Sequence, residues 1–316
     1  MENKKSRWLI SIIVAIVVIV GAGYYFIMQT TQKATHELTN SLQKAGFLYT
    51  KVDCQGLFSM QCVVNNAFLR DGTRVKKIVF NNFEQFAKIK KGKTSNIDLN
   101  ISLLGIDANG VDLKNRIMLF SIMSGRILKK SDYEKIDKII RLFVQGDMVI
   151  KGNLEFQGRK LEKFKNFGFS YNNAIFPFKL FLTGSNSNSV KEDPRNILFT
   201  NIKFDLNLKN KKETFGKILK IVSPDQNITD AKIDEKWNKF LQVALANIEK
   251  KKALSKNKLD LHLFDSVENI LNGKKDKISF LLSSKDSTGI SAMDIIKKGR
   301  EDKRFIQEHV DVKIEN

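Results

Sequence analysis

The chain has 316 residues, of which 42% are hydrophobic and 28% charged, and its formal net charge is +20. A chain of this length can bury a sizeable hydrophobic core, and it can form one large domain or two small ones. A surface this basic attracts nucleic acid, anionic lipid headgroups or acidic polymers, or it reflects a lysine-rich proteome with no ligand at all.

One uncharged stretch, Trp8–Met28, stands apart from the rest of the chain. Its twenty-one residues read WLISIIVAIVVIVGAGYYFIM. About twenty apolar residues span the hydrocarbon core of a bilayer as a helix. We therefore expect a single transmembrane anchor, with Trp8 at one membrane interface and Tyr24 and Tyr25 at the other.

The charges around this segment predict its orientation. Lys4, Lys5 and Arg7 precede it, whereas Lys33 is the only Lys or Arg among residues 29–43. The positive-inside rule then places residues 1–7 in the cytoplasm and residues 29–316 outside it. We expect the inner membrane of a Gram-negative cell with the bulk of the chain periplasmic, and a Gram-positive surface is the alternative.

A cleaved signal peptide is the alternative for the segment itself. The small residues Gly21-Ala22-Gly23 would suit a signal peptidase. The apolar run continues past them through Met28, which a short signal core does not need, and this favours an uncleaved anchor.

The only two cysteines, Cys54 and Cys62, lie shortly after the anchor. They flank a turn near Gln55-Gly56, with a candidate strand on either side. Two cysteines equally far from a hairpin tip can face each other, and an exported compartment permits oxidation. We predict a disulfide. A metal site is the weaker alternative, because no His or Asp cluster lies nearby.

The first part of the exported chain combines a helix with strands. A helix over residues 30–45, ended by Gly46, would follow the anchor as a stalk at 29–46. Alternation then predicts four strands, carried by Phe47–Val52, by Met60, Cys62, Val64 and Phe68, by Arg74–Phe80, and by Ile97, Leu99, Ile101 and Leu103.

Two helices are expected next. Residues Ile117–Leu128 are nearly all apolar and predict a buried helix. Ser131 opens a capping-box pattern, followed by a helix that presents Ile136, Ile139, Ile140, Phe143 and Val144 and ends at Gly146.

A second strand block follows, and it is rich in phenylalanine. The chain contains 23 phenylalanines, many of them at alternating positions. Pro177 lies within one run, which predicts an edge or bulged strand. The expected strands are carried by Met148, Ile150, Leu154 and Phe156, by Phe167, Phe169 and Tyr171, by Phe176, Phe178, Leu180 and Leu182, and by Ile202, Phe204, Leu206 and Leu208. Such a series predicts an antiparallel meander with one apolar face.

Later helices could cover that face. One apolar stripe runs from Phe215 to Val222, and Thr229 can cap a longer helix. Leu259, Leu261 and Leu263 alternate with Asp260 and His262, which predicts a strand. We further expect a short helix at Ser266–Leu271, a strand at Ile278–Ser283, a short helix at Ser291–Lys298 and a final strand within Phe305–Ile314.

No catalytic, metal or cofactor signature is present. The three histidines, His36, His262 and His309, are distant in sequence and lack carboxylate or Cys company at ligand spacing. Nucleotide-binding and hydrolase motifs are also missing from the sequence. We therefore predict no enzyme activity, no catalytic residue, no cofactor and no metal. An enzyme without a recognisable signature is the remaining alternative.

The phenylalanine-rich strands leave two interpretations open. In one, the apolar sheet face is packed as a core. In the other, a curved face stays partly open and holds acyl chains, for which the candidate residues are Phe167, Phe169, Phe176, Phe178 and Phe204. Alternation cannot separate these, because it reports burial from water and not what buries the residues.

The passages at Asp147–Phe181 and Arg195–Leu219 place strand, turn, strand and then helix in succession. Together with one N-terminal anchor and late helices, this order resembles AsmA-like and related envelope proteins with TULIP-type lipid-binding folds. The resemblance implies a lipid or hydrophobic ligand at the sheet and no catalysis, and it assigns no functional residues.

The expected fold class is α+β. A single transmembrane helix precedes an extracytoplasmic domain over 47–316, with possible halves at 47–184 and 197–316. A long-stranded, antiparallel, curved sheet would be packed by helices at 117–145 and 211–250. We expect a non-catalytic, membrane-anchored envelope protein that handles lipid, with membrane lipids as partners, an envelope protein as a further candidate partner, and no nucleic acid. The alternative is an envelope scaffold with a packed core and a basic partner-binding surface.

Overall fold

The computed structural model describes residues 31–315. Short gaps in that description fall at 57–58, 89–93, 112–113, 116, 119–128, 158–159, 187–196, 225, 256–257, 302–304 and 306–307. The predicted anchor Trp8–Met28, with its flanking Lys4, Lys5 and Arg7, lies outside the described residues, as do residues 119–128 of the predicted helix Ile117–Leu128.

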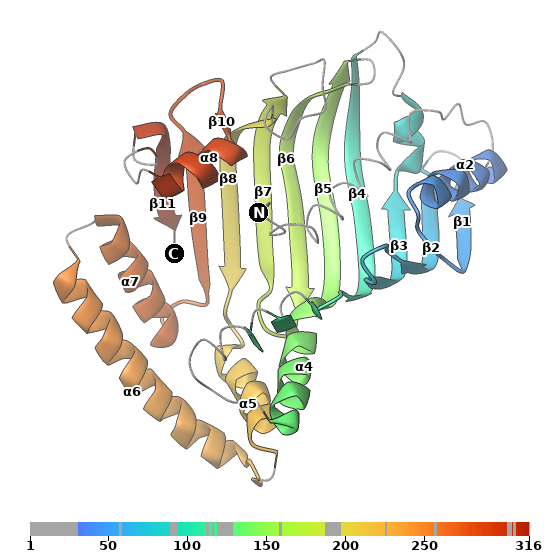
Figure 1. Cartoon of the computed structure of the whole chain (residues 1–316). Coiled ribbons are helices and arrows are strands. Elements are labelled where there is room, and N and C mark those ends of the chain that lie inside the picture. The colour runs from blue at the N-terminus through green and yellow to red at the C-terminus, as the bar shows by residue number, and fades with distance from the viewer. Residues whose placement is uncertain are drawn as a thin grey trace.

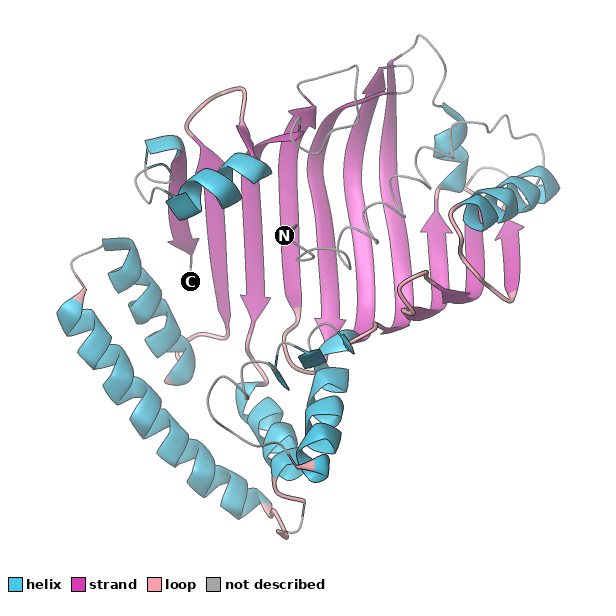
Figure 2. Ribbon diagram, in the orientation of Figure 1, coloured by secondary structure: helices cyan, strands magenta, loops and turns pink. Residues whose placement is uncertain are grey.

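The described residues build one eleven-stranded antiparallel sheet (Figures 1 and 2). Ten strands follow one another in the order β1 to β9 and then β11, and the short β10 pairs with β8. The strands are β1 (Lys51–Gln55), β2 (Gln61–Phe68), β3 (Arg74–Asn81), β4 (Thr94–Asp107), β5 (Gln145–Gln157), β6 (Lys160–Asn173), β7 (Phe178–Asn186), β8 (Ile197–Asn207), β9 (Lys277–Ser284), β10 (Ile290–Ser291) and β11 (Val310–Glu315).

Sequence order is therefore almost the same as spatial order, as in a meander. β1 and β11 are the two edges, so the sheet is open and does not close into a barrel. β7 and β8, which precede and follow residues 187–196, pair with each other. The two possible halves of the domain, 47–184 and 197–316, therefore share one sheet. This confirms the α+β class and the antiparallel meander.

The helices lie around the border of this sheet. They are α2 (Thr31–Lys44), the 3₁₀ helix η2 (Phe83–Lys88), α4 (Lys130–Val144), α5 (Lys211–Val222), α6 (Asp230–Leu254), α7 (Lys258–Leu271) and α8 (Ala292–Glu301). Figure 1 shows α2 in front of β1–β3, α4 and α5 at one end of the strands, and α7 beside β9 and β11 with α6 on its far side.

Helix α2 confirms the helix expected at 30–45, but it packs on the sheet. Ala34, Leu38 and Leu42 are fully buried and belong to the same apolar core as the first strands. Gly46, with φ of +76°, ends the helix in the left-handed region that favours glycine. The helix is thus part of the domain and does not stand apart from it as a stalk.

The disulfide prediction is confirmed. Cys54 and Cys62 are direct cross-strand partners in the β1–β2 hairpin and form a disulfide, and both side chains are buried.

The strand expected at Leu259–Leu263 is wrong, because these residues belong to α7. The leucine alternation there is only five residues long, which is too short to distinguish a strand from a helix. In a helix, Asp260 and His262 point in different directions, so they do not form the shared face that a strand would give them.

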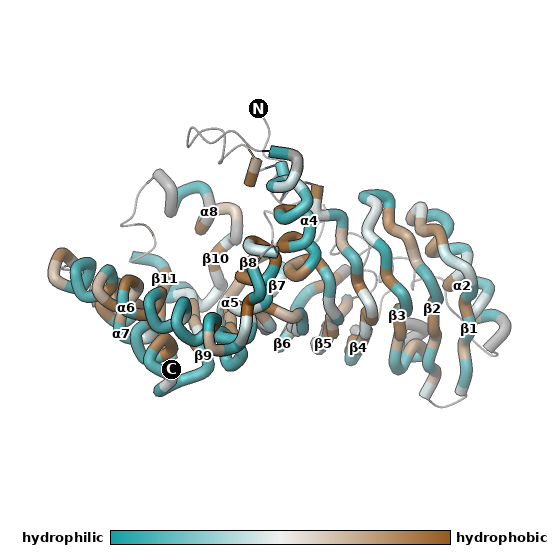
Figure 3. Tube along the Cα trace, turned by 90° about the horizontal axis from the view of Figure 1, so that it is seen from below, coloured by the Kyte–Doolittle hydropathy of each residue, from teal (hydrophilic) through white to brown (hydrophobic). Residues whose placement is uncertain are grey.

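The expectation that residues 211–250 pack over the sheet is also wrong for its longest helix. Helix α6 packs against α5 and α7 (Figure 3). Ile233, Trp237 and Ile248 of this helix are buried, whereas Phe240 is exposed. Thr229 caps the helix as predicted, since its side chain accepts a hydrogen bond from the Lys232 backbone N–H.

Two further local predictions need correction. β7 begins at Phe178, after Pro177, and lies in the middle of the sheet rather than at an edge, although its pairing with β8 does shift register, between Thr183 and Gly184. Helix α4 begins at Lys130, before the predicted cap Ser131, and the Asp132 carboxylate caps it by accepting from the Lys129 backbone N–H at 2.8 Å.

No helix within the described ranges is long and apolar enough to cross a membrane.

Candidate functional site

One face of the sheet is apolar from the first strand to the last. Residues directly opposite each other in neighbouring strands present their side chains to the same face. One unbroken row of such partners crosses all ten strands, and every member is apolar. The row is Cys54, Cys62, Phe80, Ile101, Ile150, Phe169, Leu180, Phe204, Phe280 and Ile314.

Bulges place some apolar residues on this face that strict alternation would place on the opposite face. In β6 the register shifts between Phe164 and Phe167, around Asn166 with φ of +51°. A bulge inserts one extra residue, so residues three apart can share a face. Phe164 and Phe167 therefore both lie on the same face of the sheet as Phe169.

A second bulge acts in the same way in β4. Gly105 has φ of +62°, and the register shifts between Leu103 and Ile106. Both of these side chains are buried. The Gly105 backbone N–H donates to the Asp147 carboxylate at 2.7 Å, which satisfies the group that the bulge removes from the ladder.

The two halves of the apolar face differ in exposure. On β1–β6 its side chains are mostly buried, and Ile150 and Phe80 are fully so. On β7–β9 most of them are partly exposed, namely Phe178, Leu180, Leu182, Ile202, Phe204, Leu206, Phe280 and Leu282. The apolar face is thus a closed core at one end and accessible at the other.

An aromatic row marks the boundary between these halves and extends into the accessible one. The ring centroids of Tyr171 and Phe178 are 5.7 Å apart, those of Phe178 and Phe204 5.7 Å, and those of Phe204 and Phe280 6.3 Å. These distances suit tilted aromatic contacts. Four rings from β6, β7, β8 and β9 therefore form one continuous apolar strip, which we call the aromatic strip.

Four of the five predicted face residues are brought together. Phe167, Phe169, Phe178 and Phe204 share the apolar face, and Phe167 and Phe169 contact each other at 5.0 Å between ring centroids. Phe176 is not on this face. It lies in the turn before β7, and its ring is 5.5 Å from that of Phe143 of α4.

Tyr171 and Phe280 complete the strip but were not among the five candidates. Each stood in an alternating run of the sequence, so alternation could have included them. What the sequence could not supply was the register that sets Phe280 opposite Phe204.

Tyr171 anchors the buried end of the strip. Its hydroxyl donates to the backbone carbonyl of Phe143 at 3.3 Å, which ties β6 to α4. Burial raises the pKa of Tyr171 to about 12, so the phenol is neutral at physiological pH. This side chain is a structural support and carries no charge toward a ligand.

The opposite face of the same strands is mainly polar. On β8, Lys203 and Asp205 alternate with the apolar residues, and on β9 Ser279 and Ser283 do so. Asp205 is buried there, and the Lys277 ammonium lies 3.0 Å from its carboxylate. The sheet therefore has one polar and one apolar side.

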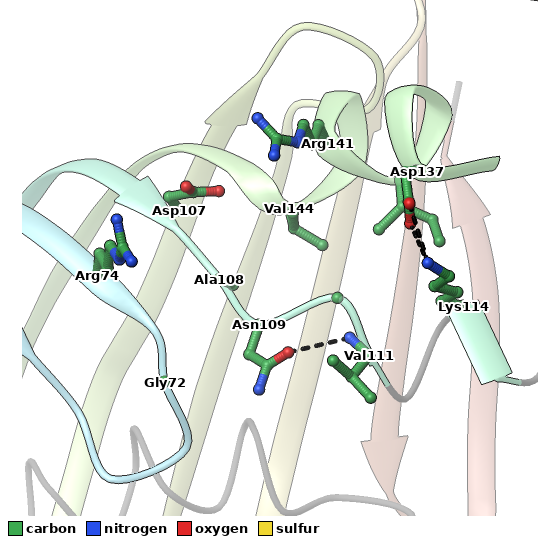
Figure 4. A pocket seen from close by; sticks show the side chains of 12 residues that line it. Gly72, Arg74, Asp107, Ala108, Asn109, Val111, Lys114, Asp137, Arg141 and Val144 are labelled. Atoms are coloured by element: carbon green, nitrogen blue, oxygen red, sulfur yellow. Dashed lines mark hydrogen bonds and ion pairs between the residues drawn. The ribbon is translucent and has the colours of Figure 1, made fainter. Parts of the chain in front are cut away.

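A cavity of about 510 Å³ lies at the strand ends beside α4 (Figure 4). Arg74, Asp107 and Arg141 line it, and Lys114 pairs with Asp137 at 2.8 Å across it. The Arg74 guanidinium is held over the Phe68 ring at 5.2 Å. Its lining mixes both charge signs, and none of its residues belongs to the aromatic strip.

Metal-binding constellations are not found in the described part of the chain. No group of three or more His, Cys, Asp or Glu side chains there could hold a metal ion. The apolar face with its aromatic strip is the candidate site, because its partly exposed rings form one contiguous apolar surface.

These features define a class of protein, an open antiparallel α+β sheet with one polar and one apolar face. Comparison with known proteins adds no family: no family sequence profile matches the chain, and no curated protein matches it.

Proposed function

We propose that this protein is a membrane-anchored, extracytoplasmic envelope protein that binds lipid through the apolar face of its sheet. The anchor is Trp8–Met28, and its preceding basic residues place the sheet on the periplasmic side of an inner membrane. The role is one of binding and not of catalysis.

The aromatic strip is the observation that carries this proposal. Contiguous large apolar patches are uncommon on soluble proteins and usually serve binding. Partly exposed phenylalanines on three adjacent strands form such a patch. Acyl chains match it, because they are long, apolar and free of hydrogen-bonding groups.

Sheet curvature and net charge support the same function. The bulges at Gly105 and Asn166 would bend their strands and allow a curved surface around a chain-like ligand. The net charge of +20 would attract anionic headgroups to the same protein.

The test is native mass spectrometry of the full-length chain purified in mild detergent, together with extraction of bound lipid. We expect co-purified lipid with the wild type. A photoactivatable fatty acid added to the purified protein should label peptides from β7–β9.

A matched pair of variants makes this test specific. Phe178 and Phe181 lie on the same strand, both partly exposed, but on opposite faces, since Phe178 opposes Tyr171 and Phe181 opposes Gly168. Phe178→Ser should reduce lipid recovery several-fold, and Phe181→Ser should not. A wild type that carries no lipid and takes no label would overturn the proposal.

The second candidate is an envelope scaffold, and the buried half of the sheet face favours it. Side chains on β1–β6 pack as an ordinary core. In that case the chain would carry no lipid, and crosslinking in cells would return a defined protein partner.

A further inference from the structure

Helix α6 presents an unusual exposed surface at the side of the sheet away from α2 (Figure 1). It has 25 residues, so it is about 37 Å long. One side of it packs on the body of the protein, and three of its large apolar side chains are exposed. They are Phe240, Val243 and Leu254, at 44%, 57% and 75% exposure.

The packed side of α6 is well defined. Near its start, Trp237 and Phe240 contact Phe215 of α5, with ring centroids 5.3 and 5.6 Å away, so the partly exposed Phe240 lies at the border between the packed and outward sides. Near its end, Lys252 pairs with Asp265 of α7 at 2.8 Å. These contacts hold the helix at both ends and fix which side faces outward.

The outward side carries only one sign of charge. At 100° per residue, the three exposed apolar residues fall in one sector of about 120°. Five lysines share that sector, namely Lys232, Lys236, Lys239, Lys250 and Lys251. The four acidic residues of the helix, Asp230, Asp234, Glu235 and Glu249, all fall outside it.

The ion pairs follow the same division. Asp234 pairs with Lys212 of α5, and Glu249 pairs with Lys252, the lysine that also pairs with α7. These acidic residues of α6 therefore form ion pairs on its packed side. None of the five lysines of the outward sector forms an ion pair with another described residue. Their charge remains available to a partner.

We propose that this outward side of α6, which we call the basic–apolar face, docks on the surface of an anionic lipid bilayer. Val243 and Leu254 would enter the headgroup region, while Lys239, Lys250 and Lys251 meet lipid phosphates on either side. A bilayer fits better than a protein groove, because the apolar residues are spread over about 21 Å between Phe240 and Leu254 with charge along both sides.

This docking surface is separate from the aromatic strip, so it does not require that the sheet bind lipid. It adds a second lipid contact beside β9 and β11, whereas the anchor would join the chain next to α2. Nine strand spacings of about 4.8 Å separate these two sides of the sheet by roughly 43 Å.

The test uses the full-length chain in nanodiscs of phosphatidylcholine, mixed with sedimentable vesicles of either phosphatidylcholine or phosphatidylglycerol. We expect sedimentation with phosphatidylglycerol only, together with slower hydrogen exchange in residues 230–254. Nanodiscs that contain phosphatidylglycerol should slow exchange in the same residues if α6 meets the anchoring membrane.

Charge-matched variants separate this face from general attraction to a basic protein. Lys239→Glu, Lys250→Glu and Lys251→Glu together should weaken vesicle affinity about 100-fold or more, at several-fold per lysine. Lys151→Glu, Lys165→Glu and Lys179→Glu make the same charge change at exposed positions of the sheet and should have a much smaller effect.

Two further variants complete the design. Val243→Ser with Leu254→Ser leaves the charge unchanged and should still weaken binding, because apolar insertion is lost. Phe178→Ser should bind vesicles as the wild type does, even where it loses lipid from the sheet. Equal losses in the two lysine triples, or no exchange protection in residues 230–254 with either source of phosphatidylglycerol, would overturn the docking proposal.

Discussion

Tyr171 connects burial, hydrogen bonding and pH at a single position. Its ring stands at the buried end of the aromatic strip, and burial raises its pKa to about 12 from an ordinary value of about 10. The unfolded chain therefore loses this proton before the folded one does. The stabilising contribution is complete below pH 10 and is lost as the pH rises from about 10 to about 12.

The prediction concerns the tyrosine titration of the folded protein. Absorbance at the phenolate band should show a late phase near pH 12, and Tyr171→Phe should remove it. The chain has five tyrosines, and Tyr49→Phe serves as the control that removes one tyrosine and keeps the late phase. A late phase that survives in Tyr171→Phe would contradict the assignment.

Asp205 tests the polar face of the sheet. Burial raises the pKa of its carboxyl, but hydrogen bonds from Ser279 and Lys277 lower it by more, so the net pKa lies below its ordinary value of about 3.9. A lowered pKa means that the carboxylate stabilises the fold above that value. This contribution is lost as the pH falls below it.

Asp205→Asn should cost about 1 kcal/mol at pH 7, because Lys277 is half exposed and the pair is screened by solvent. Urea unfolding should show the wild type and the variant converging as the pH is lowered to 3. Asp311→Asn, at an exposed pair with Lys285, is the control and should change little. A constant difference between pH 7 and pH 3 would contradict the role of this ionisation.

At the scale of elements, Lys252 joins α6 to α7. Its ammonium meets Asp265 at 2.8 Å and also Glu268, and hydrogen bonds to these two carboxylates raise its pKa above the ordinary value. A raised lysine pKa stabilises the fold at neutral pH, and this stability is lost as the pH rises through that pKa.

Lys252→Met should lower the free energy of unfolding by about 1–2 kcal/mol, because it leaves two carboxylates without their partner. Hydrogen exchange should accelerate in residues 258–271 more than in the sheet. Lys250→Met, two residues earlier and fully outward, should leave both quantities unchanged. Equal acceleration throughout the chain would mean that Lys252 acts on the whole fold and not on this helix pair.

The same helix pair shows where sequence reasoning failed. Alternation correctly indicated most strands, because a one-sided sheet imposes period two over long runs such as Ile97–Leu103. Leu259–Leu263 alternated only briefly, and these residues belong to α7, whose Asp265 and Glu268, one turn apart, both pair with Lys252 of α6. Contacts from a distant segment are invisible in local periodicity.

The candidate site shows a similar limit. Four of its phenylalanines could be predicted to share a face, because each run kept its own alternation. Phe176 could not be excluded, since only the backbone places the start of β7 after Pro177. Likewise Ala67 is buried and Phe68 exposed, because Asn66 with φ of +50° interrupts the alternation of β2.

At the scale of the whole molecule, one apolar row crosses ten strands, but the exposure of its side chains differs between β1–β6 and β7–β9. α2 packs on the edge strand β1, α4 contacts β4, β5 and β6, and α8 contacts β8 and β10. The strands whose apolar residues are partly exposed are β7–β9, and α8 contacts one of them, β8. Alternation in the sequence predicted which residues share the apolar face. It could not predict how exposed each of them is, because exposure depends on where the helices lie.

The disulfide tests where the whole domain resides. Cys54 and Cys62 can stay paired only in an oxidising compartment, because cytosolic thiols are kept reduced. We expect no alkylation by a maleimide polymer when cells are quenched in acid and the chain is denatured without reductant, and two adducts after reduction. Cys54→Ser, which frees Cys62, should label once without reductant and shows that the probe reaches the site. In the purified protein, reduction should lower stability by roughly 2–3 kcal/mol, as expected for a loop this short. Two adducts on the wild type without reductant would place the sheet in the cytoplasm and reverse the proposed orientation of Trp8–Met28.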